Sequence, residues 1–413
     1  MRAVLQVFSL DVAGKALLAV ITLLLIRFMA AEELAHYTMA LALIAVVSQT
    51  LTSTFNRIYI VGHQRLGLGS DFAALLGLQL LTILAAWVLL VPFRPHPTNV
   101  FWLALAVTLG TCMVEFGKTA LQQEQKFLTF SLVELLKTIV LCVAALVLIY
   151  LLRYHVQAWQ VLSVQAAAMT AVFLASFGRR LRLRDVIKIH PARQLAMRVI
   201  TGEYRFLFFY FALVALLSQT AVFAIKFLST DLELAAFGAA FRYYALLSLG
   251  LNAVHVVLLP LVLHSGSAKA LDVVFQQQRK ALAVFIPAVL AGMVIAEWVL
   301  PWIDHGKYPA AVPVFQILSM SAIVSFTFSP HVNLILRYEQ FKFLCRLTLA
   351  SICLHVLLAY PLVGRWGAVG AAWSAAAAFA LLNGWIYVRA TGLRRYHSIP
   401  GREEALISTA PLS

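Results

Sequence analysis

Residues 16–26 read ALLAVITLLLI, a run with one hydroxyl group and no charge. In the strands of a transmembrane β-barrel, apolar side chains facing lipid alternate with polar side chains facing the lumen. This run does not alternate. An α-helix satisfies all of its backbone hydrogen bonds internally, which a segment inside hydrocarbon requires. The run therefore predicts a membrane-spanning helix.

The composition of the whole chain extends this prediction. Of its 413 residues, 62% are apolar and 12% are charged, and the mean hydropathy is +0.89. A soluble domain has about 25% charged residues. Apolar blocks of about 20 residues recur along the chain, long enough to cross a hydrocarbon layer of about 30 Å. No small-residue cleavage site follows Arg27, so the first block is expected to be a membrane helix and not a cleaved signal peptide. The chain is predicted to be an all-α, polytopic membrane protein.

Charged residues, Gly and Pro divide the apolar residues into twelve predicted membrane helices. The helices are predicted near residues 10–28, 36–56, 72–92, 99–117, 128–151, 157–177, 206–228, 235–262, 281–303, 311–334, 342–363 and 367–389. One long basic connection, from residue 178 to about residue 204, separates two groups of six. We expect an N-terminal six-helix lobe over residues 1–190, a C-terminal lobe over residues 191–400 and a cytoplasmic tail over residues 401–413.

The net charge of +15, from 32 Lys and Arg against 17 Asp and Glu, follows the predicted topology. On the side of the long connection lie 23 of the basic residues, six lie on the other side and three lie within helices. Basic loops stay in the cytoplasm, so both termini are predicted to be cytoplasmic. The surplus charge is then explained by topology and by contact with anionic membrane lipids, and a nucleic-acid partner is not predicted.

The two halves of the sequence resemble each other. IRF at residues 26–28 recurs as IKF at residues 225–227, an offset of 199, and ELA at residues 33–35 recurs at residues 233–235, an offset of 200. A second similarity, in the linkers between the fourth and fifth helices of each half, pairs Leu121, Glu124, Gln125 and Phe127 with Leu336, Glu339, Gln340 and Phe343. Six helices per unit make this a parallel repeat, so two lobes are expected about a pseudo-twofold axis along the membrane normal.

Three stretches resemble a known family. They are LLIRFMAAEELAHYTMALAL at residues 24–43, HGKYPAAVPVFQILSMSA at residues 305–322 and GRWGAVGAAWSAAAAF at residues 364–379. All three are similar to segments of bacterial polysaccharide exporters, the Wzx-type O-antigen flippases of the multidrug/oligosaccharidyl-lipid/polysaccharide (MOP) superfamily.

The resemblance implies a V-shaped bundle of two six-helix lobes around a central cavity. It implies a transporter that moves undecaprenyl-diphosphate-linked glycans, the precursors of polysaccharides such as lipopolysaccharide O-antigen, across the bacterial inner membrane. The partners it implies are the lipid-linked glycan itself and the glycan polymerase and glycosyltransferases of the same pathway.

The sequence contains none of three common nucleotide-binding and catalytic motifs. There is no nucleotide-binding loop, no GxSxG and no HExxH. The four cysteines lie in or beside apolar blocks and form no CxxC. We therefore predict neither an enzyme nor a cofactor or metal site.

Charges inside helices are the candidate functional groups, because a charge in a membrane is costly unless it faces protein or water. Asp11 and Lys15 are four residues apart and are predicted to pair on one helix face. Two further pairs, Glu115 with Lys118 and Glu134 with Lys137, are predicted from a spacing of three. Asp11 is also a candidate proton-coupling residue, as is Glu297 near the end of the ninth helix.

Arg242 has no acidic residue three or four positions away on its own helix. It is expected to line a cavity, to extend to the membrane interface, or to pair with another helix. We predict that it lines the cavity and binds substrate phosphate, with Lys15 and Arg57 as further ligands from the facing lobe, since the guanidinium fork suits phosphate oxygens.

The main functional hypothesis is a flippase or exporter of a lipid-linked oligosaccharide that works by alternating access. A cation-coupled multidrug exporter of the same superfamily is the alternative, and such a protein is expected to place carboxylates in its cavity. A membrane-embedded glycan enzyme is a third hypothesis, and it would be expected to carry a large outer loop.

Overall fold

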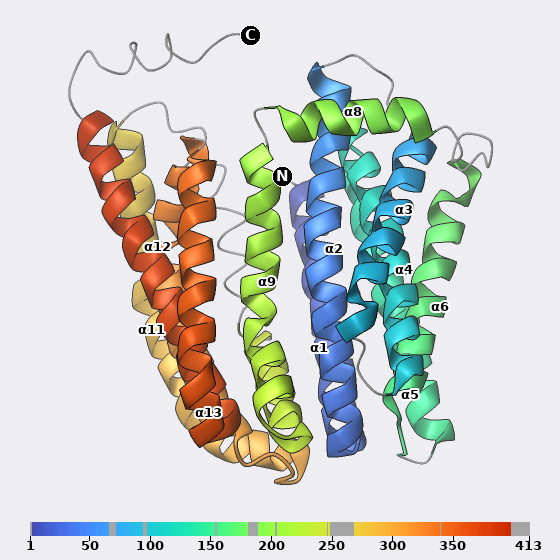
Figure 1. The fold of residues 1–413 in the computed structure, drawn as a ribbon, viewed down its shortest axis with the longest axis vertical. Helices are drawn as coiled ribbons and strands as arrows, with labels where there is room; N and C mark the ends of the chain where they lie inside the picture. The colour runs from blue at the N-terminus through green and yellow to red at the C-terminus, as the bar shows by residue number, and fades with distance from the viewer. Residues whose placement is uncertain are drawn as a thin grey trace.

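The computed structural model describes residues 2–65, 72–93, 97–152, 155–180, 189–202, 205–245, 247, 268–338 and 340–397. These residues are almost entirely helical (Figure 1). The first half contains α1 (Arg2–Phe28), α2 (Ala31–Arg65), α3 (Phe72–Leu90), α4 (Thr98–Gln123), α5 (Phe127–Leu151) and α6 (Ala158–Phe177). The second contains α8 (Ile189–Thr201), α9 (Arg205–Leu228), a helix at residues 231–245, α11 (Ala268–Asp304), α12 (Ala311–Arg337) and α13 (Phe341–His397). Two short 3₁₀ helices are η1 (Val91–Phe93) and η2 (Gly178–Arg180).

The predicted all-α membrane fold is confirmed. Within the described residues, nine helices are long and apolar enough to cross a membrane. The last two predicted helices form the single element α13, which is interrupted by the non-helical backbone of Gly367 (φ 53°, ψ −128°). Most of the predicted span 235–262 beyond residue 245 lies outside the described part. The tail at residues 401–413 lies outside it as well.

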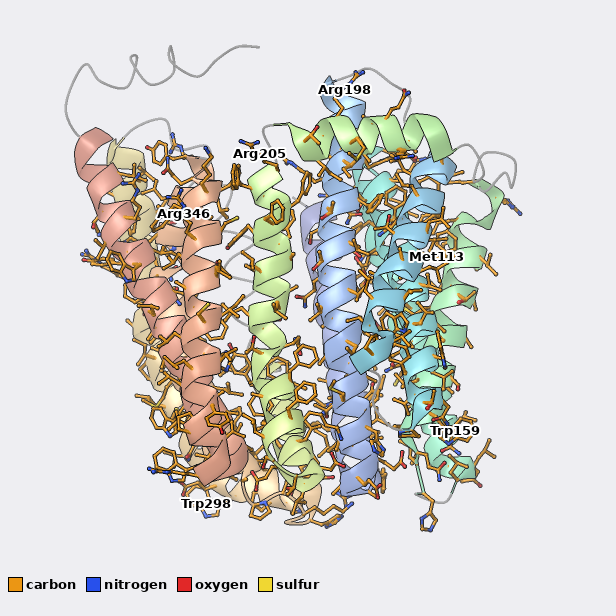
Figure 2. All side chains as sticks on the ribbon, in the orientation of Figure 1. Met113, Trp159, Arg198, Arg205, Trp298 and Arg346 are labelled. Carbon is orange, nitrogen blue, oxygen red and sulfur yellow. The ribbon has the colours of Figure 1, made fainter. Side chains whose placement is uncertain are left out.

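The helices form two groups (Figure 1). In the first, which we call the N-lobe, α1 packs on α5, and α4 packs on both α2 and α6. In the second, the C-lobe, α13 packs on α9 and α12. The groups meet where α2 lies beside α9. Arg198, Arg205 and Arg346 lie near the upper end of the view, and Trp159 and Trp298 lie near the lower end (Figure 2).

The basic connection between the lobes contains a helix that the hydropathy pattern did not predict. α8 lies across the upper end of the N-lobe, over α2 and α3 (Figure 1). Apolar side chains at helical spacing face inward, namely Ala192, Leu195, Ala196 and Val199, and Arg193 and Arg198 are exposed. A single apolar stripe among basic residues gives an amphipathic helix without making the segment hydrophobic overall.

The same hydrogen bond occurs in both lobes, at the residues of the ELA repeat. Glu33 Oε2 accepts a hydrogen bond of 2.6 Å from the Ala158 amide at the start of α6. Glu233 Oε2 accepts a hydrogen bond of the same length from the Ala368 amide, where α13 resumes after Gly367. Each carboxylate satisfies an amide that has no partner within its own helix. Any side chain at Gly367 would collide with Glu233, which explains the glycine.

A cluster of four charges joins α4 to α5 inside the N-lobe. Lys118 Nζ lies 3.0 Å from Glu115 Oε2 and 2.7 Å from Glu134 Oε2, and Lys137 Nζ lies 2.6 Å from Glu134 Oε1. The two predicted pairs are therefore present. The two pairs also form ion pairs with each other: Lys118 on α4 contacts Glu134 on α5, and Lys137 Nζ on α5 lies 3.6 Å from Glu115 Oε1 on α4. With two cations and two anions, the cluster carries no net charge.

The two glutamate caps should contribute similarly to stability. We expect Glu33→Ala and Glu233→Ala each to cost about 1 kcal/mol, the usual value of a lost cap. Thermal unfolding of the purified protein in detergent measures this. Glu32→Ala is the matched control, because Glu32 lies in the same first turn of α2 but is exposed. An equal loss in the control would show that any acidic residue in that turn has the same effect.

Lys118 should be essential to the four-charge cluster. Lys118→Met leaves two carboxylates with one cation, and removing one partner of a buried ion pair costs about 3 kcal/mol or more. We expect low yield and a lower unfolding temperature, with partial recovery in the neutral double variant Lys118→Met, Glu115→Gln. Lys126→Met removes an exposed cation paired with Glu124 and should change little. Equal effects of the two single variants would contradict a structural role for the cluster.

Candidate substrate site at the seam of the lobes

The lobes touch at two positions related by the repeat. Thr38 on α2 and Gly238 on the helix at residues 231–245 are 200 positions apart, the offset of the ELA repeat. The helices approach so closely that a Cβ on Gly238 would collide with the Thr38 side chain. Equivalent residues can face each other only across a twofold axis. The pseudo-twofold axis therefore passes between Thr38 and Gly238, and we call this contact the seam.

Arg242 lies one turn beyond Gly238 and reaches across the seam. Only 8% of its surface is exposed. Its Nη1 donates to Thr38 Oγ1 at 3.1 Å and to the Gly238 carbonyl at 2.7 Å. Its guanidinium carbon lies 5.0 Å from the centre of the Tyr37 ring, a cation–π contact with the N-lobe. Arg242 is thus held at the seam by residues of the facing helix α2.

All of these partners are uncharged. Among the described residues, no carboxylate forms an ion pair with Arg242, and its Nη2 is buried with no hydrogen-bond partner. A charged side chain that is buried is normally paired with a group of opposite charge. The guanidinium therefore has a vacant donor group and an uncompensated positive charge at the seam.

Two tyrosines of the C-lobe complete the surroundings of Arg242. Tyr243 and Tyr308 both interact electrostatically with the guanidinium and with Asp304 at the end of α11. The Tyr308 hydroxyl is buried without a hydrogen-bond partner. Burial, and then the charge of Asp304, raise the pKa of Tyr308 to about 12, so its phenol stays protonated and remains a donor. Asp304 is itself buried, and its Oδ1 accepts a hydrogen bond of 2.9 Å from the Gly306 amide.

A second bond joins the lobes at the lower end. Lys307 Nζ donates to the Arg27 carbonyl in the last turn of α1, at 2.6 Å. This carbonyl is near the end of its helix, where the dipole favours a cation. These two polar bridges to the N-lobe come from C-lobe cations, Arg242 and Lys307, and each ends on a neutral oxygen. Such bonds can break without leaving a buried anion unpaired.

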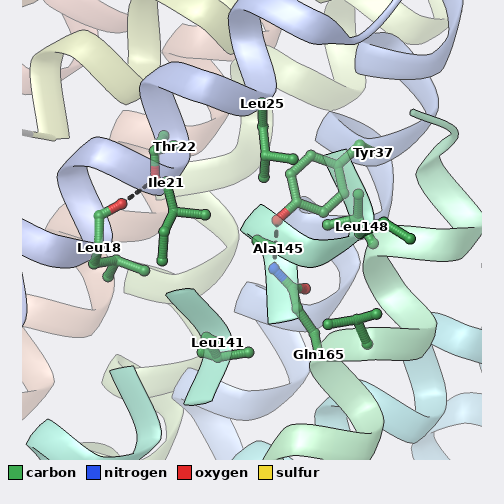
Figure 3. Close-up of a pocket in the computed structure, with 11 residues that line it drawn as sticks. Leu18, Ile21, Thr22, Leu25, Tyr37, Leu141, Ala145, Leu148 and Gln165 are labelled. Atoms are coloured by element: carbon green, nitrogen blue, oxygen red, sulfur yellow. Dashed lines mark hydrogen bonds between the residues drawn. The ribbon is translucent and has the colours of Figure 1, made fainter. Parts of the chain in front are cut away.

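Tyr37 also closes a pocket inside the N-lobe (Figure 3). Its hydroxyl accepts a hydrogen bond from Gln165 Nε2 on α6. The rest of the pocket is mostly apolar, with walls from α1, α5 and α6 that include Leu18, Leu141 and Val161. The ring of Tyr37 contacts Arg242 and its hydroxyl contacts the pocket, so one side chain connects the seam to the interior of the N-lobe.

The other predicted phosphate ligands lie away from Arg242. Arg57 is half-buried on α2, 19 residues after Thr38, which is about 28 Å along a helix. Asp11 and Lys15 belong to α1, but their side chains lie outside the part of the chain that the structure describes. Lys15 precedes Arg27 by 12 residues, or about 18 Å of helix. The structure therefore gathers Tyr37, Thr38 and Tyr308 around Arg242, and not Arg57.

Glu297, the other predicted coupling residue, is exposed on α11. Its Oε1 accepts a hydrogen bond of 3.2 Å from Gln316 Nε2 on α12. The sequence interpretation missed the seam residues Tyr37, Thr38, Gly238 and Tyr308. A signal for them was present, because Tyr37, Thr38 and Tyr308 all lie in the stretches that resemble the exporter family.

No protein-family model matches this sequence, and no curated protein matches it. The fold, however, is similar to solved transporters. A multidrug-resistance MATE family transporter of the MOP superfamily, in an inward-facing conformation, has a TM-score of 0.69 at 12% identity, over 96% of both chains. The lipid II flippase MurJ, in an inward closed conformation, has a TM-score of 0.73 at 12% identity, over 93% of this chain and 87% of MurJ.

A third match is a MOP superfamily transporter from Pyrococcus furiosus whose structure is described by the reverse polarity of its binding pocket, which suggests a different function for it. The TM-score is 0.60 at 14% identity, over 94% of both chains. At such identities the likeness establishes the fold alone. This chain is a multi-pass membrane protein with the fold of the MOP superfamily transporters.

Proposed function

We propose that this protein is a transporter that flips a lipid-linked oligosaccharide, a polysaccharide precursor, across the bacterial inner membrane by alternating access. The observation that carries the proposal is Arg242, a cation buried at the seam of the lobes, with neutral partners and a vacant donor. Glycosyltransferases and a glycan polymerase would supply and consume such a substrate.

Alternating access is supported by the way the lobes are joined. Duplicated bundles transport by rocking one half against the other around a fixed central site. Here two polar bridges join the lobes, from Arg242 to Thr38 near the start of α2 and from Lys307 to Arg27 near the end of α1. These ends of α1 and α2 are at the lower end of the molecule (Figure 1). Two of the similar structures are inward-facing and inward closed states. We take the present arrangement to be closed at the lower, extracytoplasmic side.

The charge of Arg242 favours an anionic substrate. A diphosphate carries at least two negative charges, and crossing about 30 Å of hydrocarbon is prohibitive for it without compensating groups. A guanidinium with a vacant nitrogen offers phosphate oxygens a charge-assisted hydrogen bond. An exporter of cationic drugs would place a carboxylate at this point. The Pyrococcus transporter, with its reversed pocket polarity, illustrates that this fold accommodates pockets of different charge.

Arg242 would couple binding to opening. A phosphate that approaches Nη2 competes with Thr38 and the Gly238 carbonyl for the guanidinium, and an anionic ligand is the stronger partner. Each bond taken from Thr38 or Tyr37 weakens the contact between the lobes. In this scheme Lys15 and Arg57 are cationic positions on the path from the cytoplasmic side, Asp11 stays a candidate for proton coupling beside Lys15, and exposed Glu297 is the weaker candidate.

The proposed orientation has a direct test. Reporter fusions after Arg184 and after Arg395 should report cytoplasm, and fusions at Glu32 and Asp304 should report the opposite side. The reason is the excess of Lys and Arg on the side of the long connection. An extracytoplasmic reporter after Arg184 would contradict both the orientation and the count of six helices before that loop.

Arg242→Ala should abolish export of the glycan, because no other described cation lies at the seam. Export is measured as surface glycan, together with accumulation of the lipid-linked precursor, in cells that lack the native copy. Arg242→Lys should restore export in part, since Lys keeps the charge but not the fork.

Two controls separate substrate binding from structure. Arg389→Ala removes an exposed C-lobe cation and should export normally. Thr38→Val removes one partner of Arg242 but not the cation, and it should keep most of the activity. Normal export by Arg242→Ala at matched protein level would overturn the role of Arg242, and loss of protein abundance would indicate a structural role instead.

A further inference from the structure

The pocket of Figure 3 has a counterpart position in the C-lobe. The backbone bond from Lys126 to the Leu121 carbonyl recurs from Gln340 to the Ile335 carbonyl, and the bond from Phe130 to Lys126 recurs from Leu344 to Gln340. Both give an offset of 214 between α5 and residues 341–366 of α13. This offset places Leu141, which lines the N-lobe pocket, at the position of His355.

His355 is completely buried, with 0% of its surface exposed. Neither ring nitrogen has a hydrogen-bond partner among the described residues. A neutral imidazole always carries one donor and one acceptor, and leaving either of them buried without a partner is unfavourable. Leucine fills the equivalent place in the N-lobe, so the fold itself does not require a polar residue here.

Two hydroxyl residues flank a packing contact that lies next to His355 along α13. In this contact Ile352 packs with Leu217 of α9 and Ala378 of α13. His355 is three residues after Ile352, Thr220 is three residues after Leu217, and Ser374 is four residues before Ala378. Thr220 Oγ1 donates to the Leu216 carbonyl at 2.9 Å, and Ser374 Oγ donates to the Ala371 carbonyl at 2.8 Å. Neither hydroxyl bonds to the imidazole in this arrangement, but each keeps a lone pair that could accept a hydrogen bond from it after a rearrangement.

Fixed charges lie elsewhere on the elements around His355. On α9, the ends carry Arg205 and Lys226, and Lys226 pairs with Asp231. Among the side chains that the structure describes, the remaining titratable groups are Tyr210 on α9, Glu233, Arg242, Tyr243 and Tyr244 on residues 231–245, His331 and Arg337 on α12, and Lys342, Cys345, Arg346, Cys353, Tyr360, Arg365, Tyr387 and Arg389 on α13. Among the described residues, none of these groups forms a hydrogen bond with the imidazole.

We propose that His355 is a proton-binding site through which the C-lobe couples transport to a proton gradient. The step adds one proton to the unprotonated ring nitrogen and later releases it on the other side of the membrane, with no other bond made or broken. An imidazolium needs water or hydroxyl acceptors around it, so protonation favours an arrangement in which residues 341–366 separate from α9. Pro361 and the break at Gly367 provide the places where α13 can bend. The proposal requires a transporter and does not depend on the substrate.

The test follows the distance between the lobes without any substrate. The full-length protein, with its four cysteines replaced by serine or alanine, carries spin labels at Gln122 and Val388, both exposed and near the upper ends of the two lobes. Pulsed electron paramagnetic resonance in nanodiscs is recorded at about pH 4.5 and about pH 8, an interval that extends well to both sides of the ordinary imidazole pKa of about 6.5. We expect the distance distribution to shift between the two pH values.

Two variants of His355 should show the high-pH distance distribution at both pH values. His355→Leu introduces the residue found at the equivalent N-lobe position, and His355→Gln keeps a polar side chain that cannot be protonated. His331→Gln is the control and should shift like the parent. A parent protein that does not respond to pH, or a His355→Leu protein that responds fully, would overturn the proposal. Because no substrate is present, either result leaves the Arg242 export test unaffected.

Discussion

A positive charge buried in a membrane bundle needs a partner, and Arg242 finds only a hydroxyl, a carbonyl and an aromatic ring. The same requirement is met differently elsewhere in the molecule. The cluster around Lys118 balances two cations with two carboxylates, and the carboxylates of Glu33 and Glu233 are placed on helix amides. These arrangements are complete in themselves, whereas the one at Arg242 has capacity for an anion.

The duplication allows each residue to be compared with its equivalent in the other half, and this comparison distinguishes Arg242 and His355 from the residues that maintain the fold. Thr38 and Gly238 face each other across the pseudo-twofold axis, and Glu33 and Glu233 make the same bond in each lobe. Positions that maintain the fold therefore agree between the halves. Arg242 and His355 do not, because the same offsets place Ala42 and Leu141 at the equivalent positions. A polar residue that replaces an apolar one at an equivalent position has a reason beyond packing, and function is the natural reason in a bundle where charge is costly.

The sequence predicted what depends on local pattern. For most helix ends, the apolar blocks predicted the position to within a few residues. The spacing of three residues predicted that Lys118 pairs with Glu115 and that Lys137 pairs with Glu134. The sequence did not predict the bond from Lys118 to Glu134, because that contact depends on how α4 packs on α5. Nor did it place Arg57 far from Arg242, since depth along two crossing helices is not a local property. The similarity between the two linkers was found in the right place, but its register was off by one or two residues. The paired side chains gave offsets of 215 and, for Phe127 with Phe343, 216, whereas the backbone hydrogen bonds give 214.

The two asymmetric residues are joined by a continuous set of contacts. His355 lies on the segment of α13 that ends at Gly367, and the next residue, Ala368, donates its amide to Glu233. Glu233 lies in the first turn of the helix at residues 231–245, which carries Arg242 nine residues later, and Arg242 contacts Thr38 and Tyr37 of the other lobe. Coupling between distant sites needs an element with two arrangements that both sites bias. In the proposed coupling the break at Gly367 would be that element, because a change of angle there would move Glu233 through its bond to Ala368, and with it the helix that carries Arg242.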